Sequence, residues 1–308
     1  HRRELNSLQK ELREINGVSV LIYDQTCAAE KRRRRKRGEF PNPAKRMFIN
    51  DRVCENCGDC SIKSNCLSIQ PIDTDFGRKK RVDQSSCNKD YSCNDGFCPS
   101  FVTVLGAEPH KLTAVSADPI SHLEFTPDPK IAKIDDLNPY DVFISGVGGT
   151  GVVTTGLILG MAAHLEGLHV SVINQLGFAQ KGGPVKVHLK FSKKRNQLNA
   201  ARLNINSADL ILGCDLLVAS DDESLHLSSP EKTKAIVNTH ETITGEFTRN
   251  PDLKYPNTIA LERLTTTIGE TNISIIDATE VAIEFLGDPL ASNLIMMGFA
   301  WQKGLLPI

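Results

Sequence analysis

The sequence lacks the features that would place a protein in a membrane or send it out of the cell. None of its 308 residues belongs to an apolar run approaching the roughly 18 residues of a membrane span. The charged start His1-Arg2-Arg3-Glu4 has no apolar signal-peptide core. A net charge of −1 gives no overall attraction to nucleic acid or to an anionic membrane. We therefore expect a cytoplasmic protein that binds neither.

An initiator methionine is also absent, and the chain stops at Leu306-Pro307-Ile308 without an evident terminator. These ends predict an internal fragment of a longer protein. A hydrophobic content of 40% with 24% charged residues excludes wholesale disorder. The length suffices for two domains of roughly 100–200 residues each.

Cysteine is distributed unevenly. Seven of the nine cysteines fall between Cys54 and Cys98, in a chain without an export signal. A tight, odd-numbered cluster of this kind favours thiolate ligands over disulfides. Cys27 and Cys214 stand alone and are predicted to be buried thiols, although Cys27 could also be an additional ligand.

Composition divides the chain into four zones, residues 1–45, 46–105, 106–139 and 140–308. In the first zone, the apolar Val18–Tyr23 predicts a buried strand whose sheet would lie upstream of this chain. The basic run Lys31–Arg37 predicts a solvated linker. As a charged patch, it could also attract an acidic partner protein. The proline-rich third zone predicts an extended linker.

The last zone alternates apolar, β-branched runs with helical stretches. Strands are predicted at Val142–Ser145, Val170–Ile173, Val185–Phe191, Leu210–Gly213, Ala235–Asn238 and Ile273–Ile276. Helices are predicted at Gly151–Leu165, Cys214–Ser220, Glu280–Leu286 and Asn293–Lys303. This alternation predicts an α/β, Rossmann-like domain with a largely parallel sheet, preceded by a small irregular iron–sulfur segment. No internal repeat is evident.

The spacing Cys54-x2-Cys57-x2-Cys60 is typical of iron–sulfur ligands. Three thiolates on a tight loop can reach three irons of one [4Fe–4S] cluster, and ferredoxins take the fourth ligand from a remote Cys-Pro element. Here the fourth ligand is either Cys66 or Cys98, since Cys98 precedes Pro99. All seven clustered cysteines are candidate metal ligands: Cys54, Cys57, Cys60, Cys66, Cys87, Cys93 and Cys98.

The cysteines that the first cluster does not use could hold a second cluster or another metal. Cys66, Cys87, Cys93 and Cys98 would form a complete second set, which would leave the first triplet one ligand short. Zinc is the alternative, although zinc sites usually combine two separated C-x2-C pairs rather than a triplet.

A glycine-rich loop opens the last zone. Its candidate binding residues are Gly146, Gly148, Gly149, Thr150 and Gly151, between a predicted strand and a predicted helix. Free amides at a helix N-terminus can bind a phosphate. However, Ile173-Asn174-Gln175 lacks the acidic residue that holds the ribose of NAD. A phosphate of another ligand, aided by Lys181, and simple close packing both remain open.

These residues together resemble the fused indolepyruvate ferredoxin oxidoreductases, and the last zone resembles the gamma-type domain of 2-oxoacid oxidoreductases. The strings that carry the resemblance are Ile49–Glu55, Asp83–Asp90, Gly96–Phe101, Ser145–Gly151, Ala179–Gly183, Asn238–Thr242 and Gly245–Asn250. The resemblance covers nearly the whole chain. It implies that residues 1–45 are the tail of a thiamine-diphosphate-binding domain.

The resemblance also implies oxidative decarboxylation of an aryl 2-oxoacid, indolepyruvate, with coenzyme A. Electrons would pass through [4Fe–4S] to ferredoxin in a homo-oligomeric parent enzyme that holds thiamine diphosphate and Mg. The Gly-Asp-Gly…Asn element of the thiamine site is not present here, so this chain alone is expected to be inactive and no catalytic residue is assigned. The alternatives are a zinc-stabilised nucleotide-binding regulatory module and a dinucleotide-dependent dehydrogenase domain.

Overall fold

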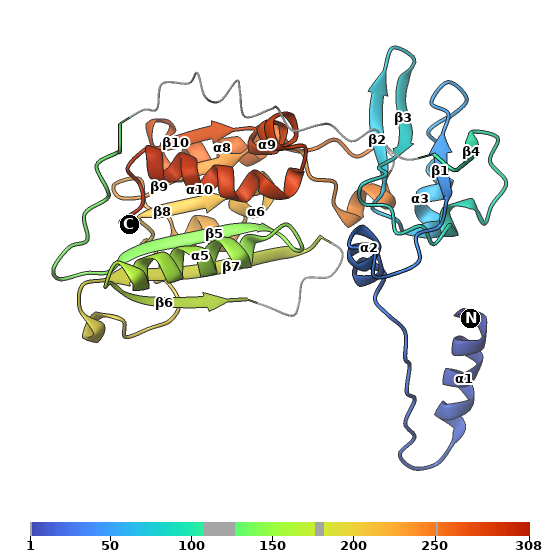
Figure 1. Ribbon diagram of the computed structural model, residues 1–308, viewed down its shortest axis with the longest axis horizontal. Helices are drawn as coiled ribbons and strands as arrows, with labels where there is room; N and C mark the ends of the chain where they lie inside the picture. Colours follow the sequence, from blue (N-terminus) through green and yellow to red (C-terminus); the bar gives the residue numbers. More distant parts are fainter. Residues whose placement is uncertain (1, 108–126, 176–181, 251) are drawn as a thin grey trace.

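The computed structural model describes residues 2–107, 127–175, 182–250 and 252–308. Figure 1 shows a six-stranded sheet with helices on both faces, and beside it the cysteine-rich region with two short strand pairs. The N-terminal helix α1 (Arg2–Glu14) extends away from both regions.

The sheet of the α/β region contains all six predicted strands. They are β5 (Tyr140–Val147), β6 (His169–Asn174), β7 (Pro184–Ser192), β8 (Leu210–Gly213), β9 (Lys234–Asn238) and β10 (Ile273–Ile276). Their order is β10-β9-β8-β5-β7-β6. Only β7 runs antiparallel to its neighbours, so the predicted largely parallel sheet is confirmed. Because β7 lies between β5 and β6, the first two strands of the domain are not adjacent.

Alternating side chains of the strands form two apolar cores, one on each face of the sheet. In β5, Val142 and Ile144 point to one core and Phe143 to the other. The first core packs against α5 (Val152–Leu165), α9 (Ala278–Leu286) and α10 (Ser292–Gln302). The second packs against α6 (Leu216–Ala219), α7 (Asp222–Leu227) and α8 (Asn257–Ile268).

Three helices of this region differ from the sequence prediction, and one of them, α7, was not predicted. The predicted helix Cys214–Ser220 is shorter, because the Asp215 side chain accepts from the Val218 amide and starts α6 there. The helix α8 was also not predicted, since its end, Thr265-Thr266-Thr267, has low helix propensity. Four short 3₁₀ turns complete this region: Arg195–Gln197, Gly245–Thr248, Glu270–Asn272 and Pro289–Ala291.

The cysteine-rich region is more regular than predicted. It contains β1 (Lys45–Ile49), α3 (Asp59–Ser64), β2 (Ile69–Thr74), β3 (Gly77–Val82), the 3₁₀ turn η1 (Ser92–Asn94) and β4 (Phe101–Leu105). β1 pairs with β4, and β2 pairs with β3, both antiparallel. Its buried hydrophobic cluster consists of Ile49, Cys54 and Ile69 alone. So small a core depends on other interactions.

Three predictions about the first zone are wrong. Val18–Tyr23 is not a buried strand, since no described strand pairs with it, and Val18 is 98% exposed. The basic run is not a linker but part of helix α2 (Ala28–Lys36). Cys27 is exposed because it precedes that helix outside either core, whereas Cys214 is buried as predicted.

Of the expected linker, residues 106, 107 and 127–139 are described. They run without regular structure, and the Ala132 amide donates to the Leu306 carbonyl at 2.9 Å, which ties this segment to the C-terminus of the α/β region. None of the described helices combines the length and the apolar character needed to cross a membrane.

Candidate functional site

Five cysteines of the cysteine-rich region line one cavity: Cys54, Cys57, Cys60, Cys93 and Cys98. Cys54 and Cys57 lie in the loop between β1 and α3, Cys60 lies in the first turn of α3, and Cys98 lies just before β4. The cavity has a volume of about 250 Å³. Cys98 Sγ lies 3.0 Å from Ser100 Oγ, which fixes the thiol next to the strand. The pairing of β1 with β4 brings Cys98, rather than Cys66, to the triplet.

Three cysteines form a second set, Cys66, Cys87 and Cys93, of which Cys93 also lines the first cavity. Burial, together with the neighbouring Cys66 and Cys87, raises the pKa of Cys93 to about 12. Burial and the neighbouring Cys66 also raise the pKa of Cys87. The pairing of β2 with β3 therefore brings Cys66 to Cys87 and Cys93. The first set thus includes Cys98, which precedes β4, and the second set includes Cys66, which precedes β2.

The loops that carry the two sets begin with the same turn. The amide of Asn56 donates to Cys54 Sγ at 3.4 Å, and the amide of Lys89 donates to Cys87 Sγ at 3.4 Å. Asn56 has φ 55° and Lys89 has φ 52°, in the left-handed region that non-glycine residues rarely adopt. The same uncommon conformation at matching positions gives the two loops the same local shape.

The correspondence continues past this turn. Gly58 (φ 81°) and Tyr91 (φ 60°) are again left-handed, and each directly precedes a helical turn, α3 or η1. From the first ligand to the helical turn, matching positions are 33 residues apart, and the remote cysteines Cys66 and Cys98 are 32 residues apart. Each half of the region is thus a strand, a ligand loop, a helical turn, a remote cysteine and a second strand. The region is an internal repeat that the sequence analysis missed, because few side chains are identical between the halves.

A buried cation lies at the first set. Lys80 on β3 is 1% exposed and lines the same cavity as Cys54 and Cys60. Burial lowers the pKa of this ammonium group, whereas a negative charge on the neighbouring Cys60 would raise it. A buried unpaired charge is costly. An iron–sulfur cluster with four thiolate ligands is anionic and would supply a counter-charge, so the donor set and its surroundings fit such a group.

The cysteines are not arranged for a single metal ion. Within the described ranges, no three Cys, His, Asp or Glu side chains lie close enough together to hold one. A four-iron cubane has a different requirement, because each thiolate binds its own iron and the four sulfurs stay apart. The arrangement of the first set therefore fits a cluster better than it fits zinc.

The glycine loop is closed by its own hydrogen bonds. The amide of Gly148 donates to Gly183 at 2.8 Å, and that of Thr150 to Val147 at 3.4 Å, so neither is available to a phosphate. A Cβ on Gly146 would come within 2.7 Å of Val152 Cγ2, which makes this glycine a packing residue. Gly149 and Gly151 have φ of 91° and 98°, a conformation that favours glycine.

A larger cavity of about 620 Å³ lies between this loop and the cysteine-rich region. Val147 and Gly183 line one side, and Leu67, next to Cys66, lines the other. The Thr248 hydroxyl donates to Asn65 Oδ1 at 3.1 Å and joins the two regions here. Three carboxylates and one guanidinium also line it: Asp215, Asp221, Glu246 and Arg249. Lys181 lies outside the described residues.

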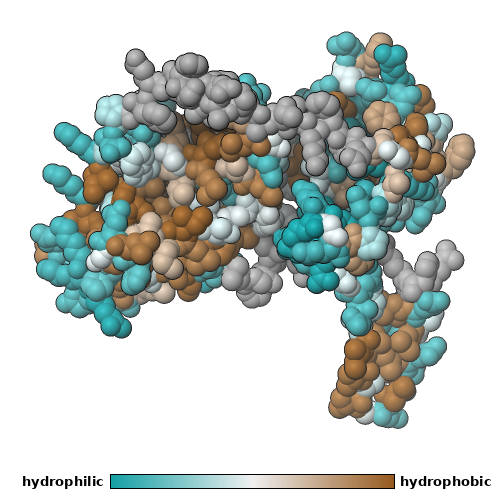
Figure 2. Space-filling model, in the orientation of Figure 1, coloured by the Kyte–Doolittle hydropathy of each residue, from teal (hydrophilic) through white to brown (hydrophobic). Residues whose placement is uncertain are grey.

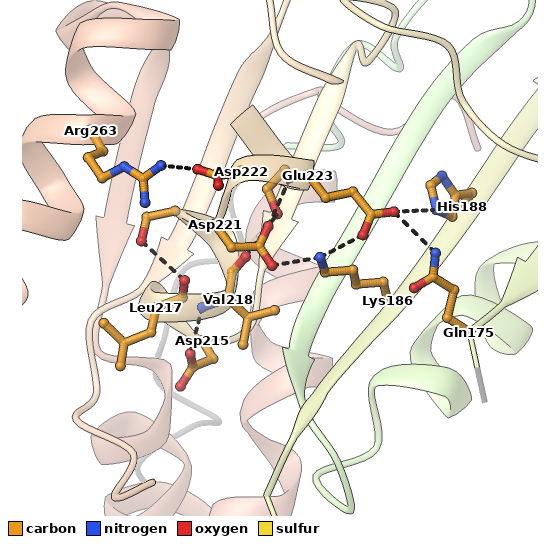
Figure 3. A network of polar contacts seen from close by, with 12 residues as sticks. Gln175, Lys186, His188, Asp215, Leu217, Val218, Asp221, Asp222, Glu223 and Arg263 are labelled. Carbon is orange, nitrogen blue, oxygen red and sulfur yellow. Dashed lines mark hydrogen bonds and ion pairs between the residues drawn. The ribbon is translucent and has the colours of Figure 1, made fainter. Parts of the chain in front are cut away.

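A buried polar network borders this strand end (Figure 3). Lys186 Nζ on β7 lies 2.6 Å from Asp221 and 2.7 Å from Glu223. Gln175 also donates to Glu223, at 3.1 Å. If the glycine loop bound a dinucleotide, an acidic residue near position 175 would be expected to hold its ribose. Here Gln175 is instead committed to the network, which the sequence analysis did not foresee.

His188 lies beside this network and is neutral. It is 1% exposed, and burial lowers its pKa to about 4. Its Nδ1 accepts from the Leu203 amide at 3.3 Å, which requires that nitrogen to be unprotonated. Its ring packs against Phe143, with the two ring centroids 4.9 Å apart, so His188 has a packing role.

Comparisons with known proteins assign the last zone of the chain to a protein family. The family described as pyruvate ferredoxin/flavodoxin oxidoreductase matches residues 141–308, more than half of the chain. The indolepyruvate oxidoreductase subunit IorB of Archaeoglobus fulgidus is 30% identical over 175 residues, covering 54% of this chain and 78% of that subunit. The corresponding subunit of Methanothermobacter thermautotrophicus is 29% identical over 163 residues, covering 52% and 77%.

Other similar proteins are named for different 2-oxoacids. The pyruvate/ketoisovalerate oxidoreductases common subunit gamma of Pyrococcus furiosus is 27% identical over 176 residues, covering 54% of this chain and 80% of that subunit. Among solved structures, pyruvate oxidoreductase subunit PORC from Thermotoga maritima has 16% identity and a TM-score of 0.38, covering 55% of this chain and 79% of its own. All three sequence matches concern about half of this chain.

Proposed function

Because the chain belongs to the pyruvate ferredoxin/flavodoxin oxidoreductase family, we propose that it is the electron-transfer and gamma-type part of an indolepyruvate ferredoxin oxidoreductase. The parent enzyme would oxidise an aryl 2-oxoacid with coenzyme A and pass the electrons to ferredoxin. Thiamine diphosphate and Mg would be bound by other parts of that enzyme, and this chain alone would not turn over substrate. We place the reaction in the cytoplasm, in a homo-oligomeric parent.

The first cluster site carries this proposal. Cys54, Cys57, Cys60 and Cys98 would hold one [4Fe–4S] cluster, which accepts and releases one electron at a time when bound. The observation that supports it most directly is the convergence of these four thiols on one cavity that also contains the buried Lys80. The ammonium group stabilises negative charge at the cluster and so favours its reduced form.

The second set supports a path of two steps. Cys93 lines the first cavity and also neighbours Cys66 and Cys87, so the two sites share a wall. A second cluster there would lie close enough to the first for direct electron transfer. Cys57 is exposed, which would give a docked ferredoxin access to the first cluster.

The basic helix α2 is the proposed docking element for ferredoxin. Arg32 and Arg35 donate to the Ser86 and Asn88 carbonyls at 2.6 Å, which holds α2 beside the second set. Figure 2 shows a hydrophilic surface over this helix. Replacing the outward-facing Arg33 and Arg34 with Gln in the parent enzyme should slow ferredoxin reduction at low salt, since charged patches raise association rates. An unchanged second-order rate would contradict this role.

The α/β region is proposed to complete the enzyme at the large cavity between the two regions. In this role it would control access of substrate or coenzyme A to the thiamine site. Three carboxylates against one guanidinium in the cavity wall disfavour a dinucleotide there. The paired amides of Gly148 and Thr150 also reduce the anion-binding capacity of the glycine loop.

Metal content and EPR spectroscopy test the proposal. The chain should be purified without oxygen, analysed for iron and zinc, and reduced with dithionite. We expect at least about four irons per chain and the signal of a reduced [4Fe–4S] cluster. The variant Cys57→Ser should lose that signal, whereas Cys214→Ala, outside both sets, should keep it. Zinc without reducible iron, even after anaerobic reconstitution, would favour the regulatory module instead.

A further inference from the structure

The second set of cysteines contains only three thiols, and the internal repeat identifies the position of the missing ligand. In the first loop the ligands stand three residues apart, at Cys54, Cys57 and Cys60. Moving each by 33 residues gives Cys87, position 90 and Cys93. Position 90 is an aspartate.

We propose that Asp90 is the fourth ligand of the second cluster, which would be held by Cys66, Cys87, Asp90 and Cys93. The inference rests on the proposed cluster-binding function and extends it to a specific mixed thiolate–carboxylate site. The second loop then reads C-x2-D-x2-C, where the first reads C-x2-C-x2-C.

The backbone supports this assignment more strongly than the spacing alone. Asp90 lies between Lys89 (φ 52°) and Tyr91 (φ 60°), just as Cys57 lies between Asn56 (φ 55°) and Gly58 (φ 81°). Two left-handed residues flanking one position define a narrow turn. Tyr91 adopts this conformation although it lacks the freedom of glycine, which costs roughly 1–2 kcal/mol. The fold therefore holds Asp90 in the place that Cys57 has in the first loop.

The surroundings of Asp90 agree with this role. Asp90 and Cys57 are both exposed, whereas the first ligand of each loop is more buried. The Ser92 hydroxyl lies 3.2 Å from both carboxylate oxygens of Asp90 and orients the group. A carboxylate oxygen has a second lone pair, so this contact leaves capacity to bind a metal.

The ligand type predicts the behaviour of the second cluster. A carboxylate is a harder ligand than a thiolate, and iron in a sulfide cluster prefers soft sulfur. The iron bound to Asp90 would therefore be the most easily lost. Mild oxidation should convert this cluster to a [3Fe–4S] form and leave the first cluster intact.

The test uses the whole chain, purified without oxygen, with iron analysis and EPR before and after a brief ferricyanide treatment. The wild type should hold about eight irons per chain, lose about one on oxidation, and then show the signal of an oxidised [3Fe–4S] cluster. Asp90→Cys should keep all its irons under the same treatment. Asp90→Ala should contain about seven irons even before oxidation.

Two further variants make the result specific. Asp95→Ala removes another exposed carboxylate of the same loop and should behave like the wild type. Cys27→Ala tests the exposed cysteine that precedes α2, and it should also leave the iron content unchanged. Loss of an iron in Cys27→Ala but not in Asp90→Ala would overturn the assignment in favour of Cys27.

The two proposals fail in different ways. If the wild type binds no reducible iron, both the cluster function and the Asp90 inference are wrong. If it holds eight irons and Asp90→Ala keeps all of them with unchanged resistance to ferricyanide, only the Asp90 assignment is wrong.

Discussion

The α/β region and the cysteine-rich region are stabilised in different ways. Each face of the six-stranded sheet packs on a contiguous apolar core in which Phe143, Ile144 and Leu212 are completely buried. The cysteine-rich region buries one small cluster around Ile49 and Ile69, and cysteines make up much of its remaining contacts. The first region has a core large enough to fold by hydrophobic burial, whereas the second, on the proposed function, would depend on its bound clusters. One chain would thus combine a self-sufficient domain with a dependent one.

Removing iron should have the largest effect on the difference in stability between the two regions. Chelation under oxidising conditions should raise amide hydrogen exchange in residues 46–105 by on the order of 100-fold or more, because ligand binding supplies most of that region's folding free energy. Exchange in β5, β8 and β9 should stay slow. Equal loss of protection in both regions would show that they fold as one unit.

The neutral His188 predicts a pH dependence confined to the α/β region. Its pKa is about 4 in the folded chain, against an ordinary value near 6.5. Between these values the unfolded chain binds more protons, so the free energy of unfolding falls as pH decreases from 6.5 to 4, by up to about 3 kcal/mol. Above pH 6.5 the stabilisation is complete.

The variant His188→Gln should flatten that slope, as measured by urea unfolding at several pH values. The amide can still accept from Leu203 but does not titrate. His164→Gln, which removes an exposed histidine of α5, serves as the control and should keep the wild-type slope. Iron content should be the same in all three proteins.

Glycine substitutions distinguish packing from ligand binding in the glycine loop. Gly146→Ala should destabilise the α/β region by roughly 1–3 kcal/mol, since the new methyl group meets Val152 and Cys214 at 2.7 and 3.0 Å. Gly149→Ala faces open space and should cost only about 1 kcal/mol, from its φ of 91°. Thermal unfolding measures both. Equal effects would mean that close packing does not explain Gly146.

Lys80 gives the smallest expected effect, and it acts on the cysteine-rich region. Lys80→Met should lower the reduction potential of the first cluster by roughly 50 mV, the value for unit charges ~8 Å apart at an effective dielectric constant of ~40. An EPR-monitored redox titration measures it. Lys232→Met is the control, because the Lys232 ammonium pairs with Asp209 in the α/β region. A shift in the control alone would contradict the role of Lys80.

Local patterns decided which parts of the fold could be predicted. The six strands of the α/β region were found because each is a short apolar run that carries its own signal, as in Leu210–Gly213. Val18–Tyr23 is also a short apolar run, but it has no partner strand among the described residues. The prediction of a strand there was therefore wrong. Helix α8 was missed because tertiary packing of Ala260 and Leu264 outweighs its weak propensity.

The sequence by itself determined that seven cysteines gather in one segment, that three of them have cluster spacing, and that an α/β domain follows. Only the tertiary structure decided which remote cysteine joins which set. The Cys-Pro element made Cys98 a candidate but left Cys66 equally possible, whereas the pairing of β1 with β4 brings Cys98 to the first cavity. The structure also shows the repeat, in which Asp90 of the second loop corresponds to Cys57 of the first loop. Side-chain identity hid this relation, because backbone conformation, and not sequence likeness, is what the two loops share.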